Sequence, residues 1–250
     1  MPLGLFGLKG TVRPTVRCVV MSDGYLELAD WRRRVAALFA TWRAEAVADP
    51  ERATAAFREA RDALFLGHPQ SPLPADRRLA GIGAQWWPYD PAYRMTVTFE
   101  PADGLTGPHA SHFAATAAGA AAPLAAPALL DIPSSGDAPV RVRQIGRVRL
   151  AGPLEGHALT VLWIEGYGNG IFLPFRDATS GRETYGAGRY LLDTVKGADH
   201  GGEPGTSTLV LDFNLAFHPS CAYDPKWVCP LAPPANAIPV PIRVGERLAG

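Results

Sequence analysis

Two segments of the chain gather residue types that can do chemistry. The first, residues 212–236, contains His218, Cys221 and Cys229. A cysteine near a histidine can act as a nucleophile when its thiolate is stabilised and accessible. The three residues could also bind zinc, but the Cys-x7-Cys spacing lacks the short gap of a structural site and no fourth ligand is evident. We favour a third alternative, in which this proline-rich segment covers a barrel mouth and buries both cysteines as small apolar groups.

The second segment, residues 166–191, has the pattern of a hairpin whose returning strand covers residues 184–192. Along that strand Gly186 and Gly188 fall on one face, which predicts a groove there. The groove could admit a ligand or the backbone of a neighbouring strand. We favour the backbone, because glycines in strands often mark bends and close approach.

Three charged residues in these segments need partners: Arg176, Arg189 and Asp212. Charges on strands with apolar neighbours must pair, face water or face a ligand. A buried Arg–Asp pair that braces the barrel is one explanation. The other is an arginine whose planar guanidinium binds the carboxylate or phosphate of a ligand. A helix-dipole site for phosphate does not apply, because the glycine-rich stretch 166–170 precedes a strand.

No other motif indicates a cofactor. The sequence has no P-loop, dinucleotide-binding fingerprint, hydrolase elbow or paired histidine ligands on a helix. His109 and His112 form a close pair, but their Ala/Pro-rich surroundings favour a loop over a metal site. We therefore predict no cofactor and no metal.

Composition limits the partners and the compartment. The 250 residues carry 24 Lys and Arg against 24 Asp and Glu, whereas nucleic acids and anionic membranes select a concentrated basic excess. We predict a small-molecule ligand, with no nucleic acid and no membrane as partner. Lys9, Arg13 and Arg17 interrupt the apolar start of the chain, so no signal peptide is expected. Three cysteines are too few for a disulfide framework, which favours the cytoplasm.

Helical and strand patterns occupy different parts of the chain. Helical spacing runs from residue 25 to 66, and Asp49 before Pro50 is typical of a cap that opens a second helix, which Gly67 ends. Ser22 or Asp23 could cap the first helix. The segments predicted as strands are 94–100, 140–150, 158–165, 170–175, 184–192, 207–213 and 239–244.

Short connections without a helical pattern join most of these strands. This favours an antiparallel sheet that closes or half-closes into a barrel. We predict a mainly β (α+β) fold, an antiparallel β-barrel or roll with two N-terminal helices packed against it. The predicted organisation is an arm at 1–24, a helical segment at 25–90 and a barrel at 91–246, with an Ala/Pro-rich excursion at 108–130.

Several short motifs together resemble a known family. They are Arg61-Asp-Ala-Leu-Phe with Pro69-Gln-Ser-Pro-Leu, Pro91-Ala-Tyr-Arg, Pro174-Phe-Arg-Asp-Ala-Thr-Ser-Gly with Glu183-Thr-Tyr-Gly-Ala-Gly-Arg-Tyr-Leu, Asp212-Phe-Asn, Pro219-Ser-Cys-Ala-Tyr with Cys229-Pro-Leu, and Asn236. Over residues 31–246 the chain resembles the bacterial and archaeal domain-of-unknown-function family numbered sixteen eighty-four. The resemblance implies shared architecture and shared polar residues, but no reaction. The family pattern has Asn where this chain has His218, which disfavours a family-wide metal site or Cys–His pair.

These observations give one functional hypothesis and two alternatives. We predict a small-molecule-binding β-barrel, which as an enzyme would act noncovalently on a small, partly apolar or anionic substrate. The alternatives are a non-catalytic binding module and a structural or interaction protein with a solid barrel. The predicted catalytic residues are Arg189, Asp212, Cys221 and Tyr185, and the predicted ligand-binding residues are Arg176, Asp177, Thr184, Asn214, His218 and Asn236.

Overall fold

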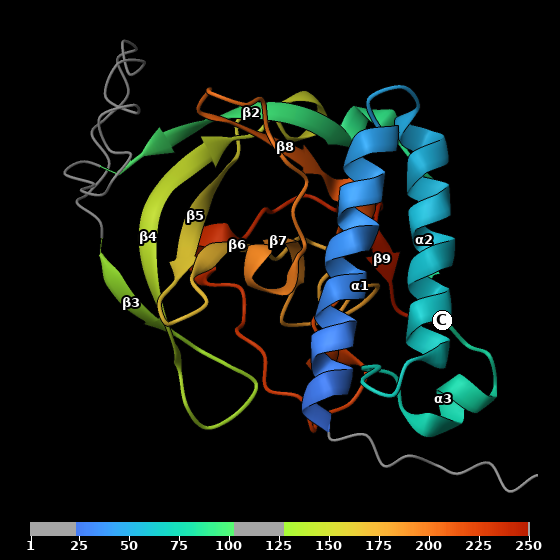
Figure 1. Ribbon diagram of the computed structural model, residues 1–250. Helices are drawn as coiled ribbons and strands as arrows, with labels where there is room; N and C mark the ends of the chain where they lie inside the picture. The colour runs from blue at the N-terminus through green and yellow to red at the C-terminus, as the bar shows by residue number, and fades with distance from the viewer. Residues whose placement is uncertain (1–23, 103–127, 250) are drawn as a thin grey trace, which may run out of the picture.

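Two N-terminal helices lie side by side against a curled sheet in the computed structural model (Figure 1), which describes residues 24–102 and 128–249. Helix α1 spans Gly24–Glu45 and helix α2 spans Pro50–Gly67. Asp49 caps α2, because its Oδ1 accepts a hydrogen bond of 3.0 Å from an amide of the first turn. The two predicted helices and the start and end of the second are confirmed.

One antiparallel sheet curls around the main core. Its hydrogen-bonded order is β7-β6-β5-β4-β2-β8, and β3 also pairs with β4. The strands are β2 (Arg94–Pro101), β3 (Leu129–Ile132), β4 (Val140–Arg149), β5 (Ala158–Ile164), β6 (Gly170–Phe175), β7 (Arg189–Asp193) and β8 (Thr208–Asp212). A register shift between Gln144 and Gly146 of β4 lets that long strand bend.

The curl is a half-barrel. Its edge strands β7 and β8 do not pair with each other, but Tyr190 of β7 forms an isolated bridge with Phe217, which follows β8. A separate two-stranded sheet joins β1 (Gln85–Trp86) to β9 (Glu246–Arg247). The predicted fold class, a mainly β barrel or roll with two N-terminal helices packed against it, is confirmed.

Apolar clusters hold the layers together. The half-barrel encloses the largest cluster, which includes Val148, Leu159 and Leu211. A second cluster joins Phe39 of α1 and Phe57 of α2 to the half-barrel side. Each fully buried large apolar side chain contributes about 1.5–3 kcal/mol. Burial of this kind fixes the helix pair on the half-barrel.

The predicted strand 184–192 is wrong at its start, because β7 begins only at Arg189. Thr184 instead forms an isolated bridge with Ser180, and a turn follows in which the amide of Gly188 donates to the carbonyl of Tyr185 at 2.9 Å. Gly188 has φ +100°, a conformation that a regular strand does not contain. The predicted groove on a glycine-lined strand face is therefore absent from this segment.

Other differences come from short elements. The predicted strand 239–244 does not form. Side chains of Arg189 and Asp177, described below, make hydrogen bonds to its backbone where a partner strand would otherwise make them. Strand β3 and the short helix α3 (Ala75–Leu79) were not predicted. Residues 129–130 of the Ala/Pro excursion belong to β3, while most of the excursion, with Ser22 and Asp23, lies outside the described residues.

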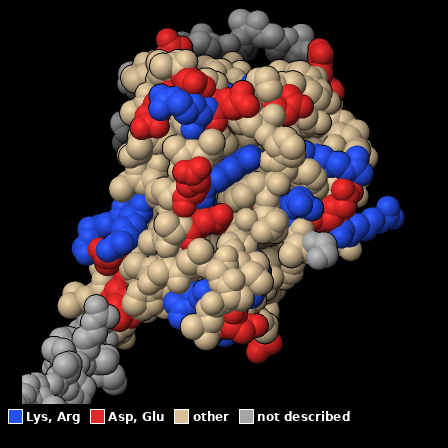
Figure 2. All heavy atoms as spheres, turned by 90° about the vertical axis from the view of Figure 1, so that its right-hand side faces the viewer, with Lys and Arg blue, Asp and Glu red and all other residues tan. Residues whose placement is uncertain are grey.

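The surface of the described residues mixes both charges. Figure 2 shows basic and acidic side chains interspersed on the face that carries α2 and α3. No helix within residues 24–102 and 128–249 is long and apolar enough to span a membrane.

Candidate functional site

Backbone carbonyl groups surround the guanidinium of Arg189. Its Nη1 donates to the carbonyl oxygens of Val244 at 2.5 Å and Glu246 at 3.2 Å, and Nη2 donates to that of Ile242 at 2.7 Å. The carboxylate of Asp177 lies 3.5 Å from Nη2. Burial lowers the pKa of Arg189 to about 10, against the opposing effect of the Asp177 charge. This side chain ties β7 to residues 242–246.

Asp177 and Thr184 stabilise the turn before β7. The hydroxyl of Thr179 donates to the Asp177 carboxylate at 2.9 Å and lies 3.0 Å from the Thr184 hydroxyl. The amide of Ile242 donates to Asp177 Oδ2 at 2.6 Å. Both predicted ligand-binding residues thus make hydrogen bonds inside the protein.

Two predicted asparagines hold separate backbone segments together, and Asp212 caps the turn that carries one of them. Asp212 Oδ1 accepts hydrogen bonds of 2.9 Å from the amide and from the side chain of Asn214. The side chain of Asn214 pairs with both backbone groups of Asp90 at 2.8 Å. Asn236 does the same with Thr160, at 2.9 Å and 3.0 Å. The side chains of Asn214 and Asn236 thus satisfy backbone groups that no neighbouring strand pairs with.

The predicted charged set is not assembled. Arg176 is exposed, Arg189 lies beside Asp177, and Asp212 lies 3.4 Å from Arg94. Two hollows are described below, a small cavity and a larger groove. None of these three charged residues lines either of them. Their catalytic and binding roles stay predictions.

Tyr185, His218 and Cys221 form a further group of predicted residues that lie together. Nε2 of His218 accepts a hydrogen bond of 3.3 Å from the Tyr185 amide, and the Tyr185 hydroxyl lies 3.7 Å from Cys221 Sγ. With Nε2 as acceptor, the neutral ring carries its proton on Nδ1. Burial lowers the pKa of His218 to about 3. The imidazole is therefore neutral at pH 7 and supplies no positive charge to a thiolate.

A small cavity lies where the helix pair meets the half-barrel. Its volume is about 80 Å³. The helices contribute aromatic side chains and one arginine, namely Trp31, Phe39, Phe57, Phe65 and Arg61. The half-barrel side contributes Tyr190, Asp193, Phe217, His218 and Tyr223. Apolar walls with a few polar groups are typical of ligand sites.

Two buried charges in the wall of this cavity are incompletely paired. Arg61 of α2 donates through Nη2 to Glu246 at 3.2 Å, but its Nη1 has no hydrogen-bond partner among the described residues. Asp193, at the end of β7, is 1% exposed. Its Oδ2 forms an ion pair of 3.2 Å with Lys196, whose side chain is half-exposed, and its Oδ1 has no hydrogen-bond partner among the described residues. Buried groups of this kind indicate a missing ligand, water or ion.

Glu246 of β9 anchors Arg61 beside the cavity. Its carboxylate accepts hydrogen bonds from Arg61, from the amide of His218 at 2.9 Å and from the hydroxyl of Tyr223. Burial raises the pKa of Glu246, and Arg61 opposes that shift. The cluster fixes the arginine in one orientation, with Nη1 left for another acceptor.

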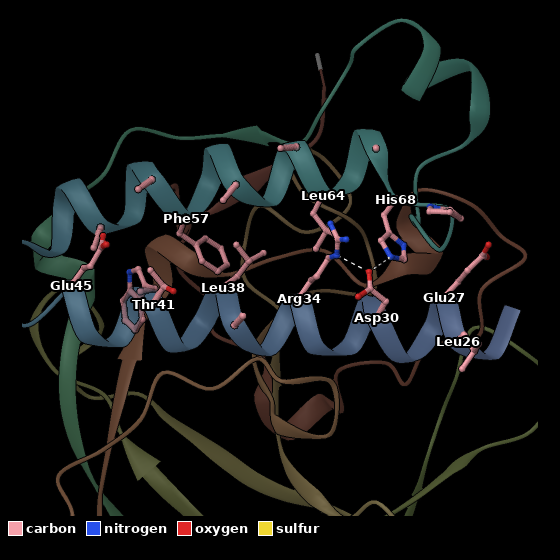
Figure 3. Close-up of a pocket in the computed structure, with 18 residues that line it drawn as sticks. Leu26, Glu27, Asp30, Arg34, Leu38, Thr41, Glu45, Phe57, Leu64 and His68 are labelled. Atoms are coloured by element: carbon pink, nitrogen blue, oxygen red, sulfur yellow. Dashed lines mark hydrogen bonds and ion pairs between the residues drawn. The ribbon is translucent and has the colours of Figure 1, made fainter. Parts of the chain in front are cut away.

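A larger groove of about 940 Å³ runs between α1 and α2 (Figure 3). Leu38, Phe57 and Leu64 line both this groove and the smaller cavity, so they form the partition between the two hollows. Helix α2 otherwise lines the groove with small side chains, whereas α1 lines it with both apolar and polar ones, among them Leu26, Glu27, Thr41 and Glu45.

The polar residues at one end of the groove already pair with each other. Asp30 accepts a hydrogen bond of 2.6 Å from Arg34, and the ring of His68 lies 3.2 Å from the same carboxylate (Figure 3). The groove thus resembles an apolar approach to the cavity more than a second polar site. Among the described residues no group of three or more His, Cys, Asp or Glu could hold a metal ion.

The sequence analysis missed the charges of the cavity. Arg61 lies four residues after Phe57 and three before Leu64, within the apolar stripe of α2. A charged residue on a buried stripe is a recognisable signal, because burial demands a partner. Asp193 and Glu246 carried no comparable signal, since each follows a short strand-like stretch.

Comparison with known proteins identifies a family without an assigned activity. Residues 82–247 match the model of a family described as a protein of unknown function (DUF1684). An uncharacterized protein from Haloarcula marismortui, solved in solution by NMR, is 27% identical, with a TM-score of 0.55, over 82% of this chain and 97% of that chain. No curated protein matches the sequence. The chain therefore belongs to the DUF1684 family.

Proposed function

We propose that the protein binds a small, partly apolar molecule in the cavity between the helix pair and the half-barrel. The observation that carries this proposal is the pair of incompletely satisfied charges in its wall, Arg61 Nη1 and the Asp193 carboxylate. Leaving a buried polar group unpaired costs about 1–3 kcal/mol, and more for a charged group. A ligand that offered an acceptor to Arg61 and a donor to Asp193 would remove both costs.

The cavity defines the class of ligand. Its 80 Å³ corresponds to about three water molecules at their liquid volume. The bound part therefore has few non-hydrogen atoms, with an acceptor such as a carboxylate at one end and a donor such as an ammonium or hydroxyl at the other. Small amino acids and hydroxy acids meet this description. The aromatic walls cover their apolar atoms.

Entry is available from the groove. Leu38, Phe57 and Leu64 separate the groove from the cavity, so rotation of these side chains would open a path between the two. A ligand with a short apolar extension could leave that extension in the groove. This arrangement supports binding and does not by itself supply a reaction.

Ligand-dependent thermal shift tests the proposal. The wild-type protein is heated with a panel of small amino acids, hydroxy acids, simple carboxylates and simple amines. We expect a member with both functional groups to raise the melting temperature, since a ligand at 100 times its Kd stabilises by about 2.7 kcal/mol. Members with only one of the two groups should give a smaller shift.

Asp193→Asn is the matched variant, because it keeps the shape of the side chain and removes its charge. We expect it to weaken binding of an ammonium-bearing ligand by at least about tenfold. Asp131→Asn is the control, since that aspartate has a half-exposed side chain paired with Arg141 on the surface. Equal binding by both variants, or no shift with any member of the panel, would contradict the proposal.

A further inference from the structure

The outer surface of the helix pair carries small side chains where a helix that faces water usually carries charges. Between Arg34 and Glu45 of α1, the exposed residues are Ala36, Ala37, Ala40, Thr41 and Ala44. On α2, the exposed residues that line the groove are Ala56, Ala60, Ala63 and Gly67. A contiguous exposed surface with so few polar groups is typical of a face that another protein surface covers.

The groove between the two helices can receive a third helix. It runs along both helices, with Leu26 and Gly67 at one end and Glu45 and Ala53 at the other (Figure 3), and has a volume of about 940 Å³. Packed helices lie with their axes about 8–10 Å apart, and the distance depends on the side chains at the contact. Helix α1 of a second copy fits such a groove, because its exposed side chains between residues 34 and 45 are all small.

Charged residues of opposite sign flank the middle of the groove. Figure 3 shows Arg34 and Glu45 on different sides of that middle. Arg34 binds Asp30 through Nε at 2.6 Å, which leaves its two Nη atoms for a further carboxylate. When two copies associate antiparallel about a two-fold axis, the ends of the groove are exchanged, so Arg34 of each copy approaches Glu45 of the other. The groove is therefore complementary in charge to a second copy of itself.

The size of the helix pair is sufficient for a dimer interface. Helix α1 has 22 residues and α2 has 18. At 1.5 Å per residue and a diameter of about 10 Å, the pair presents a face of about 30 Å by about 20 Å. Two such faces bury about 1,200 Å² in total, which is at the lower end of the range for specific interfaces. An interface of this size predicts a dimer that dissociates on dilution.

We propose that the groove between α1 and α2 binds α1 of a second copy of this chain, in a two-fold symmetric dimer. The two α1 helices cross antiparallel near Ala40 and Thr41. Each α1 lies in the groove of the other copy, and the four helices form one layer between the two half-barrels. This inference does not rest on ligand binding in the cavity. Because the dimer closes the groove, a ligand of the cavity enters the separate subunit.

Sedimentation velocity of the full chain across a concentration series tests the dimer. We expect a monomer–dimer equilibrium in the wild type. Ala60→Glu should raise the dissociation constant at least about tenfold, because it places a charge in the floor of the groove. Ala55→Glu is the matched control, since Ala55 is also exposed on α2 but does not line the groove. A wild type that stays monomeric at every concentration, or equal dissociation constants for the two variants, would overturn the proposal.

Reversal of the two charges tests the two-fold arrangement. Arg34→Glu and Glu45→Arg should each be monomeric where the wild type is dimeric, because each variant faces its own copy with two like-charge pairs. An equimolar mixture of the two variants should form dimers again, since both pairs then have opposite charges. The mixture contains the same two chains, so any local effect of losing the Asp30 contact is still present in it. If the mixture stays monomeric, the proposed pairing is wrong.

The N-terminal segment of the same chain is the alternative occupant of the groove. Its Lys9 and Arg17 are sites of tryptic cleavage. A monomeric wild type in which Ala60→Glu speeds cleavage at these two positions would assign the groove to that segment and overturn the dimer. Equal cleavage of the Ala60→Glu and Ala55→Glu variants, together with a dimeric wild type, supports the second copy as the occupant. Circular dichroism of each variant confirms that it is folded.

Discussion

Buried arginines in this protein differ in how far their N–H groups are satisfied. Arg189 donates to three backbone carbonyls and lies beside Asp177; its Nε lacks a partner, but the residue lines none of the main hollows. Arg61 leaves Nη1 without a partner in the wall of a cavity. A guanidinium enclosed by carbonyls belongs to the fold, whereas one that faces a cavity can bind a ligand. This difference is the reason why the proposed ligand is assigned to Arg61 and not to Arg189.

Arg189→Met should destabilise the protein by about 3–5 kcal/mol, because it removes one partner of a buried ion pair and leaves three carbonyls unpaired. The exposed Arg176, at the end of the neighbouring strand, provides the matched control. Arg176→Met should change the free energy of unfolding by less than about 0.5 kcal/mol. Urea denaturation measures both values. Similar midpoints for the two variants would show that Arg189 is not a structural brace.

At the scale of elements, regular strands were predictable and the segments held by side chains were not. The strand 170–175 agrees with the prediction at both ends, because a continuous apolar run bounded by turn residues defines it locally. Segment 239–244 has a similar composition, yet Arg189 and Asp177 supply its hydrogen bonds. Those partners are more than fifty positions away, so local pattern carries no sign of them.

The same limit applies to the candidate site. Tyr185, His218 and Cys221 were predicted as functional residues, and the fold does bring them together. The cavity, however, depends on how α1 and α2 pack against the half-barrel, which no local pattern specifies. Arg61 and Asp193 are 132 positions apart in sequence, and their common environment appears only in three dimensions.

Gly188 shows how one backbone conformation fixes the start of β7. It has φ +100°, and a Cβ added there would collide with the carbonyl oxygen of Phe175 on β6. We expect Gly188→Ala to destabilise the protein by more than about 1 kcal/mol, through left-handed strain and this close approach. Gly67→Ala is the control, because a Cβ at the end of α2 meets nothing within 4 Å. Thermal unfolding should show a lower melting temperature for the first variant and little change for the second.

At the scale of the whole molecule, buried histidines couple stability to pH. His200 is 2% exposed, its Nδ1 accepts from the amide of Asp212 at 3.2 Å, and its ring packs on those of Phe39 and Trp42. Burial lowers its pKa to about 3, from 6.5 in an unfolded chain. Between these values the unfolded chain binds a proton that the folded protein does not. His200 therefore makes the folded state less stable as pH falls below about 6.5.

His200→Gln should remove this contribution. We expect the free-energy advantage of the wild type over the variant to shrink by about 1.4 kcal/mol for each pH unit below 6.5, down to about pH 3. Urea denaturation at pH 7, 6 and 5 measures the difference. Asp212 and Glu246 have the opposite effect on stability, because burial raises their pKa values. Both proteins contain these two residues, so the comparison between them cancels that effect. Parallel stability curves for the two proteins would show that His200 is protonated in the folded state.

The acceptors for Arg61 and Arg189 come late in the chain. Glu246 supplies a carboxylate to one arginine, and residues 242–246 supply carbonyls to the other. During synthesis both arginines leave the ribosome before these acceptors, so Arg61 lacks its carboxylate and Arg189 lacks its three carbonyls until residues 242–246 have emerged. A product that ends before residue 242 retains two cations it cannot bury, and such partly folded chains are what cellular proteases remove.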